Sequence, residues 1–343
     1  SKALLRSAEQ ILEQISSTTR SHGGGGTITA EEFAERARAE VAHYRDIWDG
    51  VDATIEVVPG VSSGLMVSKG RLLVPSRSRI PVNRVDALIQ HEIGTHLVTY
   101  FNGKAQRFRQ LQNGFAGYEE LQEGIAVLAE YLAGGMTPAR LRTLAARVIG
   151  VDAATNGASF IDVFRLLCRY GFSRQQAFNI TIRIYRGGGL VKDCIYLRGL
   201  LTVLEYLRNG GEFEPLFVGK ISAKHIPIVR ELQSRHVLEP PKFMPRYVTR
   251  QSCRERLQRV RSERAIPRQD LELHYHGIRE VRRAREVRGG SQALVVDALP
   301  PVERQAYAAI GRLEVAPAIA VDEDRHRVRV QPDPPLPGKL AAQ

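Results

Sequence analysis

The sequence predicts an α+β fold that is mainly helical, in which a small mixed sheet lies beside one helix and a helical subdomain follows. Apolar residues recur at helical spacing over most of residues 3–235. Short runs rich in valine, isoleucine and leucine occur between residues 54 and 74 and have the length of strands. With 343 residues, 43% of them hydrophobic, the chain can bury a sizeable core in one or two domains.

The N-terminal region, residues 1–50, is expected to contain two helices with a flexible break between them. The first helix covers residues 3–17, and four glycines at 23–26 interrupt the pattern. Thr29 suits the cap of a second helix that ends near residue 46, because its hydroxyl can accept a hydrogen bond from the first helical turn.

A small sheet and a buried helix are expected in the next region, residues 51–135. The strands are residues 54–58, 65–67 and 71–74, and Lys69-Gly70 between the last two predicts a hairpin turn. The helix that follows begins near Pro81 and presents an apolar stripe made of Val82, Val85, Leu88, Ile89, Ile93 and Leu97.

Helices dominate the expected structure after residue 135. The region 136–245 should contain five of them, at about residues 138–149, 159–170, 173–184, 193–208 and 222–235. Residues 246–343 are expected to form a basic extension, which is helical and rich in arginine to about residue 288 and partly disordered beyond it.

The string His-Glu-Ile-Gly-Thr-His at residues 91–96 resembles a zinc-binding helix motif with one residue too many. Side chains four apart on a regular helix diverge by about 40°, whereas side chains five apart diverge by about 140°. A π-bulge would absorb the extra residue and bring His91 and His96 onto one face, and Gly94 would let the backbone deform. If the helix is regular instead, Glu92 and His96 are the natural pair of ligands.

A catalytic zinc usually has three protein ligands and one open position, so the two histidines need a partner. Residues 117–132 have helical spacing and offer four carboxylates, those of Glu119, Glu120, Glu123 and Glu130. Glu119 and Glu123 share a face, so one could bind the metal while the other orients a ligand by hydrogen bonding. We select Glu123 as the ligand, because the small residues Gly124 and Ala126 permit close approach of another helix, and Glu119 as the orienting residue.

Three segments in order resemble a known family. They are the 91–96 string, Gln-Glu-Gly-Ile-Ala at 122–126, and Tyr-Arg-Gly-Gly-Gly-Leu-Val-Lys-Asp at 185–193. Together they resemble the bacterial proteins named for a QEGLA motif and described as flavohemoglobin expression-modulating, a family that is similar to the microtubule-associated tyrosine carboxypeptidases. The resemblance covers about residues 40–245, and isoleucine replaces the leucine of the motif.

The resemblance implies a zincin-like metallopeptidase core that holds Zn²⁺. Carried over to this chain, it makes His91, His96 and Glu123 the ligands and Glu92 the catalytic base that serves the attacking water. The expected activity is removal of a C-terminal residue, for which tyrosine is one candidate, from a peptide or protein tail. By analogy with zincins, an edge strand of the small sheet could pair with this extended peptide.

A carboxypeptidase must also recognise the terminal carboxylate and stabilise the oxyanion. Arg186 is the first candidate for the carboxylate and Lys192 the second, since both are cationic and lie in the third segment. Tyr185 or Tyr196 could donate a hydrogen bond to the oxyanion. The alternative is that these cations are ordinary surface charges. The triple glycine 187–189 is either a flexible turn or a place where the backbone approaches a ligand.

The net charge of +12 favours acidic partners, which include an acidic peptide tail, anionic lipid and nucleic acid. A second hypothesis is therefore a non-catalytic regulatory or nucleic-acid-binding protein that uses a zincin-like scaffold and the basic extension.

The chain contains no apolar run long enough for a membrane span and no recognisable secretory signal. Three widely separated cysteines, Cys168, Cys194 and Cys253, are expected to be reduced thiols in a cytoplasmic protein.

Overall fold

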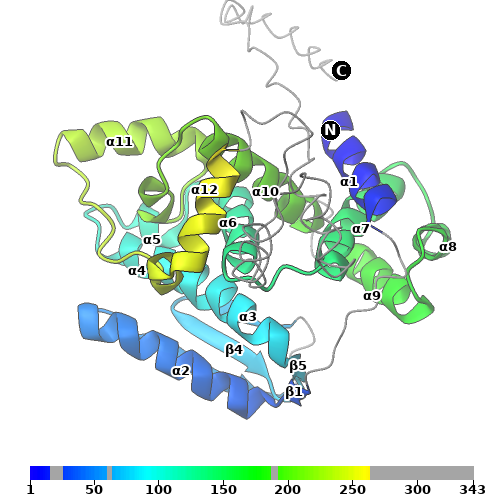
Figure 1. Ribbon diagram of the computed structural model, residues 1–343, viewed down its shortest axis with the longest axis horizontal. Helices are drawn as coiled ribbons and strands as arrows, with labels where there is room; N and C mark the ends of the chain where they lie inside the picture. Colours follow the sequence, from blue (N-terminus) through cyan, green and yellow to red (C-terminus); the bar gives the residue numbers. More distant parts are fainter. Residues whose placement is uncertain (16–25, 60–63, 187–191, 263–343) are drawn as a thin grey trace, which may run out of the picture.

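Helices make up most of the fold, as the sequence predicts (Figure 1). The computed structural model describes residues 1–15, 26–59, 64–186 and 192–262. The α-helices in these ranges are α1 (Lys2–Gln14), α2 (Ala30–Ile47), α3 (Val85–His91), α4 (Val98–Lys104), α5 (Gln110–Asn113), α6 (Tyr118–Leu132), α7 (Pro138–Thr155), α8 (Phe160–Arg169), α9 (Arg174–Tyr185), α10 (Lys192–Arg208), α11 (Ile226–Ser234) and α12 (Gln251–Ser262). Short 3-10 turns η1 (Val82–Arg84), η3 (Glu214–Phe217), η4 (Ala223–His225) and η5 (Arg246–Thr249) join them.

Local capping explains where several helices begin. Thr29 caps α2 as expected: its hydroxyl accepts from the Glu32 amide, and the Glu32 carboxylate accepts from the Thr29 amide. The same reciprocal arrangement begins α8 at Ser159 and α9 at Ser173. These caps depend on residues three apart, which is why the starts of these helices can be predicted from the sequence alone.

The small sheet is mixed, as expected, and consists of β2 (Thr54–Val58), β4 (Arg71–Pro75) and β3 (Met66–Ser68) in that spatial order. β2 runs parallel to β4, and β3 pairs antiparallel with β4 through the Lys69-Gly70 turn, where both residues have positive φ. Helix α2 packs on β2 and β4, and Figure 1 shows it beside β4. The segment that follows α3, Glu92–Leu97, contacts β3 and β4. A separate pair, β1 (Thr27–Ile28) with β5 (Ile80–Pro81), precedes η1.

Helices α6 and α10 cross at two glycines. A Cβ on Gly124 would overlap the backbone of Gly199, and a Cβ on Gly199 would overlap the carbonyl oxygen of Glu120. The two helix backbones therefore touch, which is the close approach that the small residues around Glu123 predict. This contact fixes α6 against α10 at the residue next to Glu123.

The end of the described chain differs from expectation. We assigned residues 246–262 to the basic extension, yet Tyr247 is fully buried, and Val260 is almost so. The Cys253 thiol and the Arg256 guanidinium both donate to the carbonyl oxygen of Leu132 at the end of α6. The packed body therefore continues past residue 245 to α12. Residues 263–343 and the triple glycine lie outside the described residues.

One contiguous apolar core joins the described regions, from Leu4 in α1 to Val260 in α12. The regions that we expect at 1–50, 51–135 and 136–245 all contribute to it. Within the described ranges, every helix is too short or too polar to cross a membrane.

Candidate metal centre

The segment between α3 and α4, Glu92–Leu97, is a π-helix. The helix distortion that the five-residue histidine spacing requires is thus present. No space is left for a side chain at Gly94, because a Cβ there would meet Gln90 Oε1 at 2.6 Å and the Tyr247 ring at 3.2 Å. The Thr95 hydroxyl donates to the Gln90 carbonyl oxygen at 3.1 Å. This hydrogen bond helps to satisfy a backbone acceptor whose usual partner in a regular α-helix is the amide four residues later.

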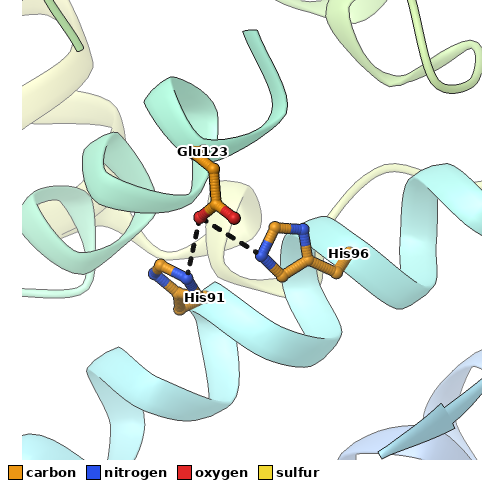
Figure 2. Close-up of side chains that lie close together, drawn as sticks. All are labelled: His91, His96 and Glu123. Carbon is orange, nitrogen blue, oxygen red and sulfur yellow. Dashed lines mark ion pairs between the residues drawn. The ribbon is translucent and has the colours of Figure 1, made fainter. Parts of the chain in front are cut away.

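The π-helix brings His91 and His96 to the same side, where Glu123 of α6 faces them (Figure 2). Glu123 Oε2 lies 3.5 Å from His91 Nε2 and 3.7 Å from His96 Nε2. One donor atom from each residue lies within 4.8 Å of the others. The alternative pair, Glu92 with His96, depends on a regular helix and loses its basis here.

This donor set fits a metal ion. Ligands about 2.0–2.2 Å from a tetrahedral ion are separated from one another by about 3.4 Å, close to the two distances from Glu123. Glu123 Oε2 is buried and has no hydrogen-bond partner among the described residues. A buried carboxylate oxygen without a partner is costly, and a bound cation would supply that partner.

Burial and mutual proximity shift the protonation of the three residues in different directions. Burial lowers the pKa of His96 to about 4, although Glu123 opposes the shift. Burial would raise the pKa of Glu123, but the two histidines outweigh it and lower that pKa to about 2. Burial would also lower the pKa of His91, but the carboxylates of Glu123 and Glu130 raise it to about 10. At neutral pH, His96 and Glu123 are in the forms that bind metal, and His91 must release a proton to do so.

Glu92 lines a cavity that His91, His96 and Glu123 also line, and it is only 7% exposed. Burial raises its pKa to about 7, against the lowering effect of His91. A carboxyl group with a pKa near 7 can both accept and return a proton at neutral pH.

The residue that contacts the far side of His91 is Glu130, not Glu119 as we expected. Glu130 Oε1 lies 2.9 Å from His91 Nδ1. Glu119 lines the cavity, and the described hydrogen bonds and ion pairs do not connect it with the three candidate ligands. The reason is the direction of α6. Its first turn lines the cavity at Glu119, and the helix then runs into the interior, where Glu130 is fully buried. The carboxylate that contacts the buried side of His91 therefore lies after Glu123 in the sequence instead of before it.

The cavity in front of these residues has a volume of about 310 Å³. One wall is β3 and the residue before it, with Leu65, Met66 and Val67. Four cationic side chains also line it, those of Arg183, Arg186, Lys192 and Lys220. The cavity thus combines the candidate metal ligands, the edge strand and a group of cations.

The four residues that we expected to bind substrate are not all in the cavity. Arg186, Lys192 and Tyr196 line it. Tyr185 does not: it is 38% exposed, and its hydroxyl donates to the Ala158 carbonyl oxygen. Tyr185 is at the exposed side of α9, so the expectation that it serves the oxyanion is wrong.

The phenol of Tyr196 keeps its proton and can therefore donate a hydrogen bond. Burial, and then the negative charge of Glu123, raise the pKa of its phenol to about 12, so it stays protonated. The guanidinium of Arg147 lies 5.3 Å from its ring centre and that of Arg183 lies 6.0 Å away. Arg183 also forms a 2.5 Å ion pair with Asp193, so its charge is already matched.

Lys220 is a cavity residue that the sequence analysis missed. Its ammonium lies 5.1 Å from the ring centre of Tyr100 and 5.5 Å from that of Tyr118, which also lines the cavity. Burial lowers the pKa of Lys220, although the negative charge of Glu119 opposes this shift. Nothing in the local sequence marks this lysine, because it reaches the site only through the fold.

The chain was compared with models of known families. The model of the family "Microtubule-associated tyrosine carboxypeptidase" matches residues 1–263. The chain belongs to this family. Membership implies a peptidase-like enzyme of the carboxypeptidase type. The family match ends at the residue after α12, which agrees with the packing of residues 246–262 in the body. None of the curated proteins compared with the chain matches it.

Proposed function

We propose that this protein is a zinc-dependent carboxypeptidase that removes a C-terminal residue, with tyrosine as the first candidate, from a peptide or protein tail. The observation that carries the proposal is the π-helix, which places His91 and His96 together with Glu123 beside the buried Glu92. Two histidines and one carboxylate are a common ligand set of catalytic zinc. Within the family, the sequence of residues 122–126 favours the bacterial QEGLA-motif branch.

The chemistry divides between the ion and the protein. Zinc, when bound, would lower the pKa of a coordinated water and polarise the scissile carbonyl. Glu92 accepts the proton of the attacking water and then gives it to the leaving amine. Tyr196, whose phenol stays protonated, donates a hydrogen bond to the oxyanion.

Substrate binding uses the edge strand and the cations. β3 is an edge of the sheet and lines the cavity, so an extended peptide can pair with it. Arg186 and Lys192 are the candidates for the terminal carboxylate, and Lys220 joins them because it lines the same cavity. A cation in the cavity favours a free C-terminal carboxylate over the uncharged middle of a chain.

We prefer this function to nucleic-acid binding. The described part of the basic extension, residues 246–262, packs against α6. We also propose a reducing compartment such as the cytoplasm, since all three cysteines are free thiols.

The test is a peptide library with varied C-terminal residues, read by mass spectrometry for loss of the last residue. Activity should disappear with a chelator and return with zinc. Glu92→Gln should retain zinc and lose at least about 100-fold in turnover, whereas His91→Ala should lose zinc. The exposed His236→Asn and Glu35→Gln variants are matched controls that should behave as the unchanged protein. Equal loss of zinc in Glu92→Gln and His91→Ala would show that the roles are misassigned.

A further inference from the structure

The imidazole of His91 lies between two carboxylates of one helix. Its Nε2 faces Glu123 Oε2 at 3.5 Å, and its Nδ1 faces Glu130 Oε1 at 2.9 Å. Glu123 and Glu130 are seven residues apart on α6, which is about two helical turns, so both point from the same face. Only the contact with Glu130 has hydrogen-bond length.

Glu130 is fully buried, and two arginines fix it in place. Arg84 Nη2 lies 2.5 Å from its Oε2. Arg140 binds both oxygens, with Nη2 at 2.9 Å from Oε1 and Nε at 3.1 Å from Oε2. Each carboxylate oxygen therefore accepts two hydrogen bonds, which leaves Glu130 little freedom to rotate.

The two arginines come from different elements. Arg84 is the last residue of η1, directly before α3, and it also donates to the Gly135 carbonyl oxygen after α6. Arg140 lies in the first turn of α7. Glu130 thus joins the start of the helix that carries His91 to the end of the helix that carries Glu123.

We propose that Glu130, held by Arg84 and Arg140, is a positioning residue that keeps the proton of His91 on Nδ1 and leaves Nε2 free to bind the metal. An ionised carboxylate can only accept a hydrogen bond, so Nδ1 must donate and the tautomer is fixed. Two guanidinium groups, which do not deprotonate, keep Glu130 ionised. The inference rests on the proposed function only in taking His91 as a metal ligand.

Zinc affinity, measured by competition with a chromophoric chelator, tests the proposal. Glu130→Gln should weaken zinc binding by about 10–100-fold, because the amide is a weaker acceptor and leaves the two arginines without a counter-charge. Glu120→Gln is the matched control: Glu120 is also on α6 and also pairs with an arginine, Arg198, but it does not contact His91. It should bind zinc as tightly as the unchanged protein.

A second variant separates positioning from folding. Glu130→Asp keeps the negative charge that the arginines need but withdraws the carboxylate by one methylene. It should fold and still bind zinc more weakly. In the unchanged zinc-loaded protein, nitrogen NMR of the His91 ring should show a protonated Nδ1, a measurement that needs no variant.

The proposal is overturned if Glu130→Asp and Glu130→Gln bind zinc like the unchanged protein, or if the NMR shows Nδ1 without its proton. These results are distinct from a failure of the proposed function. A protein that cleaves none of the peptides but loses zinc affinity in both Glu130 variants would refute the carboxypeptidase and retain Glu130 as the positioning residue.

Discussion

Glu92 is a carboxylate that lines the cavity with only 7% of its surface exposed. Burial disfavours its charged form, which is why its pKa rises to about 7. The same burial that makes Glu92 a useful base is expected to cost stability in the metal-free protein whenever the group is ionised.

We predict that Glu92→Gln removes a pH-dependent loss of stability from the metal-free protein. The folded-state pKa of about 7 lies above the ordinary pKa of 4.5 for an unperturbed glutamate. The folded state therefore keeps a proton that the unfolded state releases, so stability from this group is complete below pH 4.5 and is lost as the pH rises to 7. Relative to Glu92→Gln, the unchanged protein should lose about 1–3 kcal/mol between pH 5 and pH 7.

Urea unfolding of chelator-treated protein at the two pH values measures this difference. Glu35→Gln, at an exposed position, is the control and should follow the unchanged protein. If Glu92→Gln and the unchanged protein lose stability equally between pH 5 and pH 7, Glu92 is not held in a high-pKa environment.

At this scale the sequence identifies candidate residues but not which of them meet. Helical spacing places Glu119, Glu123 and Glu130 near one face of α6, and His91 could contact any of them. The contact with Glu130 depends on where α3 crosses α6. Tyr185 was misassigned for the same reason, because the spacing does not show which face of α9 points to the cavity.

At the scale of elements, the π-helix is the feature that the sequence predicts best. Its evidence is local: two histidines five apart and a glycine between them. The tertiary structure adds the surroundings of that glycine, where the Tyr247 ring and Gln90 occupy the space of a side chain. Gln90 lies one helical turn before this glycine and is a local neighbour, but Tyr247 could not be assigned to this turn from the sequence, since it lies about 150 residues later.

Gly124→Ala tests the contact between α6 and α10. The added methyl group would overlap backbone atoms of Gly199, which cannot move aside as a flexible side chain can. We expect a loss of about 3 kcal/mol in the free energy of unfolding and weaker metal binding, because Glu123 precedes this glycine. Denaturant unfolding and chelator competition measure the two effects.

The control is Gly26→Ala, where an added Cβ meets no atom within 4 Å. Its stability should stay within about 1 kcal/mol of the unchanged protein. Similar stability of the two variants would mean that the helices separate easily and that the close approach does not position Glu123.

At the scale of the whole molecule, the last described helix is part of the body. We predict that a chain ending at residue 262 folds, whereas one ending at residue 245 does not. The shorter chain lacks the buried side chains of Tyr247, Cys253 and Val260 and the bonds to the Leu132 carbonyl at the end of α6. Loss of these three buried side chains is expected to cost about 6–10 kcal/mol, which is comparable to the typical total stability of a domain.

Circular dichroism and thermal unfolding of the two truncated chains provide the measurement. Cooperative unfolding of the chain that ends at residue 245, at the temperature of the longer one, would show that α12 is dispensable. The family match through residue 263 favours the opposite outcome.

Local spacing predicts the helical class, the hairpin, the Thr29 cap and the distorted helix, because each depends on residues only a few positions apart. It also marked Glu123 as the partner of the two histidines. The contact of Glu130 with His91, the place of Lys220 in the cavity and the packing of α12 on the core follow from the tertiary structure alone. These contacts join residues about 40 to 130 positions apart, and helix crossing, not local spacing, brings them together.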